Sequence, residues 1–181
     1  MKKTVLTFGL IAGGLLSGMM LLTLPFHERI SFDTAEIIGY TTIVLASLLV
    51  FFGVRSYRDN VAGGRLTFGR ALLVGLLITL VSSVCYVATW QFVYYRLAPG
   101  FVDKYVDHQI ERERASGATP EQLAATAQKM EQFKALYRNP LVNIALTFLE
   151  PLPIGVVASL ITAGILTRRR RLEMGNAAAF S

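Results

Sequence analysis

Charged residues are scarce in this sequence. Aspartate, glutamate, lysine and arginine make up 17% of the 181 residues, whereas a soluble domain usually carries about 25%. The charges are also clustered, which leaves long apolar runs with almost none. Such runs are long enough for a helix to cross a hydrocarbon core about 30 Å thick, and too long for barrel strands. Because only helices and closed barrels satisfy their backbone in lipid, the sequence predicts an all-α membrane protein.

Reactive side chains and catalytic motifs are also few. Cys85 is the only cysteine, so no intramolecular disulfide can form, and its apolar surroundings predict a packing role. The chain has no Walker or dinucleotide-binding pattern, no HExxH pair and no serine–histidine–aspartate or cysteine–histidine arrangement. We therefore assign no catalytic residue, no metal ligand and no cofactor, and a non-enzymatic protein is favoured over an enzyme.

Four apolar runs predict four transmembrane helices. They lie at about residues 4–26, 34–54, 68–95 and 141–167. Together they predict a four-helix bundle in a single membrane domain over residues 1–181. The first run is long enough to span, so a retained helix is favoured over a cleaved signal peptide. Asp33 and Glu36 resemble a capping box at the start of the second helix, and Thr67 is a candidate N-cap for the third.

Residues 99–139, between the third and fourth spans, are polar and amphipathic. Apolar residues recur at helical spacing on both sides of a turn near Gly117. Thr119, Pro120 and Gln122 have the pattern of N-cap, N1 and N3 residues, which predicts a second helix after the turn. The segment is therefore expected to form an extracytoplasmic helical hairpin that stands in water or lies flat on the membrane.

Basic residues gather near the chain ends and between the second and third helices. Those that we expect to contact anionic lipid head groups are Arg55, Arg58, Arg65, Arg70, Arg168 and Arg169. The segments on the other side of the membrane carry a slight excess of acids. The positive-inside rule therefore predicts that both termini lie in the cytoplasm. Phosphate binding by residues 55–70 is the alternative role for this loop, whereas nucleic acid is not an expected partner because no nucleic-acid-binding fold is recognisable.

Glu150 lies well inside the fourth apolar run. A carboxylate at that depth costs several kcal/mol unless it is paired, hydrated or protonated. Pro151 and Pro153 follow, and each removes a helical hydrogen bond, which predicts a kink beside the acid. An outward-opening polar pocket is expected there, and its candidate members are Glu150, Tyr40, Thr41, Tyr86, Gln91 and Asn143. Either these residues form a ligand or proton site, or a protonated Glu150 only joins the helices by hydrogen bonds to Tyr40 or Gln91.

The loop after the second helix carries a family resemblance. Residues 55–60 read RSYRDN, residues 63–65 read GGR and residues 67–71 read TFGRA. This pattern resembles a family of small membrane proteins known as the domain of unknown function 4199 family. The resemblance implies a four-helix protein of the bacterial inner (cytoplasmic) membrane, and it transfers no catalytic residue and no activity.

No motif selects one activity, so three functional classes stay open. We favour a non-enzymatic membrane protein that binds a partner or a small ligand. A small transporter, with or without proton coupling, would use the pocket around Glu150. A membrane enzyme acting on lipid would need a nucleophile and a base, which the sequence does not assign. The expected partners are membrane lipids and a protein that docks on the outer hairpin. A homodimer is the alternative use of the small-residue stripe in the first helix, but packing within the chain is favoured for Gly9, Gly13, Gly14 and Gly18.

Overall fold

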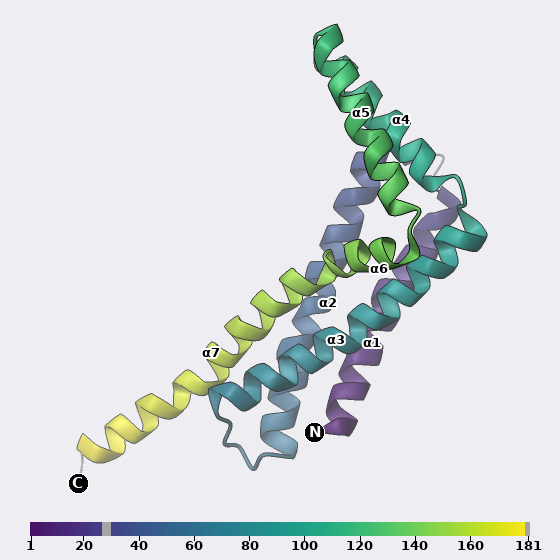
Figure 1. Cartoon of the computed structure of the whole chain (residues 1–181). Helices are drawn as coiled ribbons and strands as arrows, with labels where there is room; N and C mark the ends of the chain where they lie inside the picture. The colour runs from purple at the N-terminus through teal and green to yellow at the C-terminus, as the bar shows by residue number, and fades with distance from the viewer. Residues whose placement is uncertain (27–29, 180–181) are drawn as a thin grey trace.

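The computed structural model describes residues 1–26 and 30–179, with side chains described up to residue 167. Every regular element in this part of the chain is a helix (Figure 1). In chain order the elements are α1 (Lys2–Thr23), η1 (Leu24–Phe26), α2 (Phe32–Asn60), α3 (Phe68–Phe92), η2 (Val93–Leu97), α4 (Phe101–Ala115), α5 (Pro120–Tyr137), α6 (Pro140–Phe148) and α7 (Pro151–Ala179). The predicted all-α class is confirmed.

Four segments are long and apolar enough to cross a membrane, as predicted. They are Lys2–Phe26, Phe32–Asn60, Phe68–Leu97 and Pro140–Thr167. Between 22% and 44% of the most apolar window of each segment is buried against other helices, so most of the apolar surface faces outward. Outward apolar surface suits contact with lipid chains, which are as apolar as leucine. The chain is therefore a membrane protein with four candidate spans.

The second helix is longer than the apolar run that predicts it. It continues to Asn60 and includes Arg55 and Arg58, which the sequence pattern places in a loop. No glycine or proline lies between Val54 and Gly63. In the last turn Arg55 Nε lies 3.6 Å from Asp59 Oδ2, a spacing of four residues that supports a helix. The change from apolar to polar residues therefore does not mark the end of this helix, which continues through the polar residues to Asn60.

The start of α2 also differs from the prediction. Its N-cap is Ser31, whose Oγ accepts a hydrogen bond from the backbone N–H of Thr34 at 3.3 Å. The predicted cap at Asp33 is therefore wrong by two residues. Asp33 lies instead in the first turn, where its negative charge faces the positive pole of the helix dipole.

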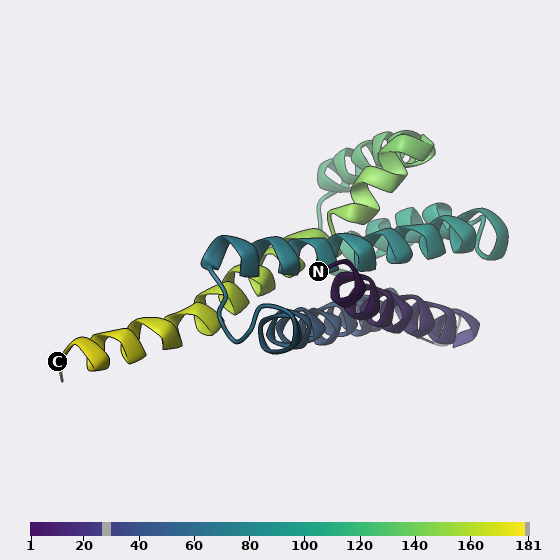
Figure 2. The same ribbon diagram turned by 90° about the horizontal axis from the view of Figure 1, so that it is seen from below.

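Helix α3 lies at the centre of the bundle and packs against α1, α2 and α7. Seen from below, α1 and α2 lie next to each other, with α3 alongside (Figure 2). The α3 side chains of Val74 and Ile78 are completely buried. Burial of such β-branched side chains between helices supplies apolar packing that does not depend on water.

Glycines set how closely α1 approaches α3. A Cβ atom at Gly9 would lie 2.6 Å from Cβ of Val81, and one at Gly13 would lie 2.6 Å from Cβ of Cys85. The two helices can therefore pack this closely only because both positions lack a side chain. A Cβ at Gly14 would meet nothing within 4 Å. Half of the glycine stripe is thus used within the chain, and Cys85 is a packing residue at that contact.

Helices α4 and α5 run side by side and project from one end of the bundle (Figure 1). The turn between them ends in the capping box that the sequence predicts. Thr119 Oγ1 accepts from the backbone N–H of Gln122, and the Gln122 side chain accepts from the backbone N–H of Thr119. Lys134 Nζ of α5 lies 2.6 Å from Asp103 Oδ1 of α4, which joins the two helices near their base.

The first turn of α2 contacts α4. Asp33 Oδ1 lies 3.6 Å from His108 Nε2 and 3.5 Å from Arg112 Nη1. The ring of Phe32 lies 5.0 Å from the ring of His108. These contacts hold the paired helices against the end of the bundle.

Asp103→Asn is expected to remove a pH-dependent part of the stability of this helical pair. The hydrogen bond from Lys134 and the nearby positive charges lower the pKa of Asp103 below its ordinary value of 3.8. A pKa that is lower in the folded state stabilises the fold above the ordinary pKa, and this stabilisation is lost as pH falls through the folded pKa. Thermal unfolding from about pH 6 to about pH 2 checks this. The difference in unfolding temperature between wild type and Asp103→Asn should become smaller at low pH.

The expected gap is small, because the Asp103 side chain is 46% exposed and salt screens exposed pairs. Asp107→Asn is the matched control, since Asp107 is an exposed α4 acid for which the described residues provide no ion pair. If the difference in unfolding temperature between wild type and Asp103→Asn stayed constant over the whole pH range, the role given to the Asp103 carboxylate would be contradicted.

The basic segments lie at the opposite end of the bundle from α4 and α5. The N-terminus, the loop between α2 and α3 and the C-terminal end of α7 are all found there (Figure 1). Arg65 and Arg70 are exposed, and more than half of the Arg55 side chain is exposed. The side chains of Arg168 and Arg169 lie outside the described part of the chain. Tertiary structure thus gathers three separate basic segments at one end.

Candidate functional site

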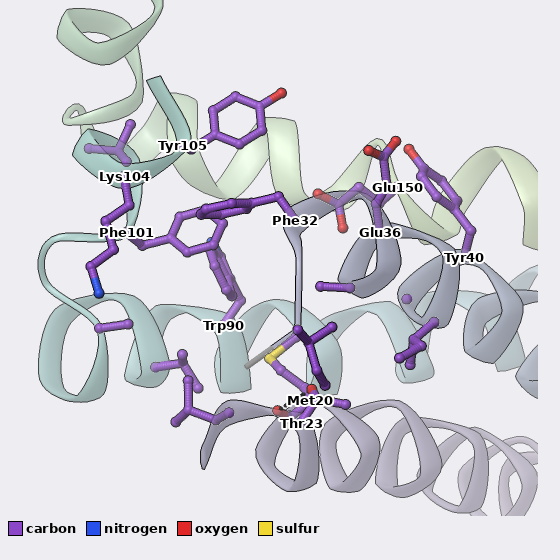
Figure 3. Close-up of a pocket in the computed structure, with 18 of the residues that line it drawn as sticks. Met20, Thr23, Phe32, Glu36, Tyr40, Trp90, Phe101, Lys104, Tyr105 and Glu150 are labelled. Carbon is purple, nitrogen blue, oxygen red and sulfur yellow. Dashed lines mark hydrogen bonds between the residues drawn. The ribbon is translucent and has the colours of Figure 1, made fainter. Parts of the chain in front are cut away.

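A pocket of about 650 Å³ lies at the end of the bundle that carries α4 and α5 (Figure 3). Its walls come from the last turns of α1, the first turns of α2, the end of α3 with η2, the start of α4 and the end of α5. The fourth span contributes Glu150. The lining residues that define its chemistry are Phe32, Glu36, Tyr40, Tyr86, Trp90, Phe101, Tyr105 and Glu150.

Aromatic rings form the wall nearest α4. The ring centroid of Phe32 lies 5.9 Å from that of Phe101 and 6.1 Å from that of Tyr105. Trp90 packs edge-on against Phe101 at 4.8 Å. Edge-to-face pairs hold one another in a defined geometry. Because the rings come from α2, α3 and α4, packing of three helices preforms this apolar aromatic wall.

Two carboxylates lie at the other end of the pocket. Figure 3 shows Glu36 of α2 and Glu150 close together, with Tyr40 beside them. The Tyr86 hydroxyl of α3 donates a hydrogen bond to Glu150 Oε2 at 2.6 Å. The partner of Glu150 is therefore Tyr86, rather than Tyr40 or Gln91 as the sequence analysis expects.

Glu150 owes its position to an interruption of the fourth span. Helix α6 ends before Leu149, and α7 begins at Pro151. Because Pro151 and Pro153 have no N–H, the helical hydrogen bonds to the carbonyls of Thr147 and Leu149 cannot form. The predicted kink is thus a break between two helices, and it places Glu150 against α3 at the edge of the pocket.

The other predicted site residues lie elsewhere. Gln91 Nε2 donates to Asn143 Oδ1 at 2.6 Å, Asn143 is completely buried, and neither residue lines the pocket. Thr41 lines a shallow surface depression with Arg112, and this depression borders the pocket because Glu36 and Tyr40 line both. The predicted residues that do line the pocket are Tyr40, Tyr86 and Glu150. The single cluster expected from helix depth is therefore divided, with Gln91 and Asn143 paired away from the pocket and Thr41 at its border.

Tyr137 connects the buried amide pair with the aromatic wall. Trp90 Nε1 donates to the Tyr137 hydroxyl oxygen at 2.8 Å, and Asn143 Nδ2 donates to the Tyr137 carbonyl at 3.4 Å. Burial raises the pKa of Tyr137 to about 12, so its hydroxyl stays neutral at physiological pH. The last residue of α5 is thereby fixed to α3, which keeps Trp90 in place.

Sequence reasoning does not include the aromatic wall in the site. Phe32, Phe101 and Tyr105 lie just beyond the ends of the predicted spans, where aromatic residues commonly mark the membrane boundary. Their position near the membrane boundary could have marked them as candidates, but it does not predict which rings contact one another. Among the described residues, no group of three or more His, Cys, Asp and Glu side chains could hold a metal ion.

A comparison with protein families identifies the chain. The family model described as "Protein of unknown function (DUF4199)" matches residues 7–168. The chain belongs to the DUF4199 family. The resemblance carried by residues 55–71 is thus confirmed. Neither the curated proteins nor the solved structures give a match.

The match range of the DUF4199 model contains every residue that lines the pocket. The pocket is therefore part of the region that defines membership of the family. Because DUF4199 is a family of unknown function, membership adds no activity.

Proposed function

We propose that this DUF4199 protein is a non-enzymatic membrane protein that binds a small amphipathic ligand. The observation that carries this proposal is the 650 Å³ pocket with an aromatic wall and a pair of carboxylates. Pockets for small molecules commonly measure about 300–1,000 Å³, with a mostly apolar lining and a few convergent polar groups. An apolar body would lie along the rings of Phe32, Trp90 and Phe101, and a polar head would lie near Glu36 and Glu150.

The position of the pocket supports an amphipathic occupant. The pocket lies where α1 and α3 end and α2 begins, which is where the apolar spans meet polar sequence. Molecules with an apolar body and a polar end concentrate at this boundary of a membrane. A ligand of this kind would reach the pocket from the membrane itself.

Binding is tested with the single tryptophan of the chain, Trp90, which lines the pocket. Bromoundecanol, whose bromine quenches indole fluorescence at short range, is titrated into protein held in a neutral maltoside detergent. Saturable quenching is expected. Gly39→Leu should weaken it about tenfold, because Gly39 lines the pocket and a Cβ there meets nothing within 4 Å, so the leucine occupies ligand space without a clash.

Gly164→Leu is the matched control. Gly164 also has nothing within 4 Å of an added Cβ, but it lies on α7 and does not line the pocket. Its titration should equal that of wild type. Quenching that rises linearly without saturation, or that is the same in Gly39→Leu and wild type, would show partition into the detergent and would refute the proposed function.

We further propose that both termini lie in the cytoplasm and that α4 and α5 lie outside, in the inner membrane of a bacterium. The proposal rests on the basic segments at one end of the bundle and the positive-inside rule. With Cys85 replaced by serine, an impermeant maleimide should label Ser116→Cys in intact cells. It should label Asn60→Cys only after the cells are opened. The opposite pattern would mean that the orientation is inverted.

A transporter is the second candidate function, and the broken fourth span favours it. Interrupted helices beside an intramembrane acid are typical of ion and substrate sites in transporters. Under this reading Glu150→Gln would leave the protein folded and abolish transport, whereas a purely binding role predicts no transport in the wild type.

Docking of a protein on α4 and α5, a homodimer through Gly14 and Gly18, and lipid chemistry remain further proposals that no contact in the described residues favours.

A further inference from the structure

We infer that the polar head of the ligand is a cation, so that the pocket takes an alkylammonium amphiphile. This inference rests on the proposed function, because it names the chemical class of the molecule bound in the same pocket. The apolar wall alone would accept many tails. The electrostatics of the Glu36 and Glu150 end decide which head group fits.

Both carboxylates at that end lack a cationic partner within the described residues. Tyr86 satisfies Glu150 Oε2, and no described lysine, arginine or histidine forms an ion pair with Glu36 or Glu150. By contrast Asp33, one helical turn away, is paired with His108 and Arg112. Two neighbouring carboxylates repel each other, and a positive charge between them removes that repulsion.

The backbone offers one acceptor at the same place. Helix α6 ends at Phe148 and α7 begins at Pro151, so the negative end of one helix dipole lies beside the positive end of the other and the two offset each other. Pro153 cannot donate the helical hydrogen bond to the Leu149 carbonyl, which removes one backbone partner of that oxygen. The two carboxylates therefore set the sign of the potential, and they attract an ammonium group and repel a phosphate, sulfate or carboxylate head.

The rest of the lining agrees with this orientation. Figure 3 shows the hydroxyl end of Tyr40 beside Glu150, which adds a neutral acceptor next to the carboxylates. Lys104 lies at the opposite end of the pocket, beyond the aromatic wall. A cationic head at Glu36 and Glu150 would therefore send its alkyl tail toward Phe32, Phe101 and Trp90.

The test compares three probes with the same brominated eleven-carbon tail. Bromoundecyl trimethylammonium, bromoundecanol and bromoundecyl sulfonate are titrated separately, in neutral maltoside detergent, and quenching of Trp90 is recorded. The ammonium probe should bind at least about tenfold more tightly than the alcohol, and the sulfonate should bind most weakly. Glu36→Gln and Glu150→Gln should each weaken ammonium binding about tenfold and so reduce the preference for the ammonium probe over the alcohol.

Glu121→Gln is the control for a lost carboxylate, because Glu121 is exposed in the first turn of α5 and does not line the pocket. Equal or tighter saturable binding of the alcohol or the sulfonate would overturn the cationic head and leave the proposed function standing. An ammonium preference that survives in Glu36→Gln/Glu150→Gln would overturn the assignment to these two acids. No saturable quenching by any probe would overturn both the inference and the proposed function.

Discussion

Gly13→Leu is expected to lower the free energy of unfolding by about 3 kcal/mol, the upper range for overpacking a well-packed core. The first atom of the new side chain would lie 2.6 Å from Cβ of Cys85 and 2.9 Å from its Sγ. Neither helix can rotate away without losing its other contacts, because α1 and α3 form the most extensive helix pair in the bundle. Thermal unfolding in a neutral detergent, followed by circular dichroism, measures the loss.

Gly14→Leu is the matched control for this substitution. The two changes add the same side chain to adjacent positions of the same helix, so they alter hydrophobicity and helix propensity equally. A Cβ at Gly14 meets nothing within 4 Å, and the change in stability should stay within about 0.5 kcal/mol. Equal destabilisation by the two variants would mean that α1 does not pack on α3 through Gly13.

Asn143→Leu is expected to cost about 1.5 kcal/mol, near the upper end measured for hydrogen bonds between membrane helices. Asn143 is completely buried, and its Oδ1 accepts from Gln91 Nε2 at 2.6 Å. Leucine branches at Cγ as asparagine does, but it is larger and has no acceptor, so the Gln91 amide would be left without a partner in an apolar site. The measurement is again the unfolding midpoint in detergent.

A double-mutant cycle separates the hydrogen bond from the loss of packing. Gln91→Leu should cost about as much as Asn143→Leu, and the double variant should cost clearly less than their sum, because it removes donor and acceptor together. Asn60→Ala, at the exposed end of α2, should change stability by less than about 0.5 kcal/mol. Strict additivity of the two substitutions would argue against a direct bond between the side chains.

Some local elements were predictable from short stretches of sequence. The capping box at Thr119 and Gln122 forms as predicted because its partners are three residues apart, so the helix needs no distant contact to begin there. The cap of α2 was placed at Asp33 rather than Ser31, since both residue types cap helices and the choice depends on the path of the preceding chain. Local patterns thus locate these two helix starts to within two residues, whereas the polar C-terminal end of α2 was missed.

The candidate site was less predictable. Tyr40, Tyr86 and Glu150 line the pocket, whereas Gln91 and Asn143 pair with each other away from it. Residues at one depth of a membrane can face different neighbours, because depth follows from position along the helix and facing follows from its rotation. Sequence position therefore suggested the level of the site but not its membership.

What the sequence alone determined about this protein is its class: a DUF4199 chain with four apolar helices, a polar segment between the third and fourth, and a proline-interrupted fourth span. These features depend on composition and on neighbours within a turn or two. Tertiary structure alone decided that Gly13 and not Gly14 faces α3, and that Glu150 meets Tyr86, 64 residues away in sequence. Such pairings depend on how whole helices rotate and pack against one another. A sequence does not reveal this rotation, because lipid and protein interior are equally apolar and residues facing either one look alike.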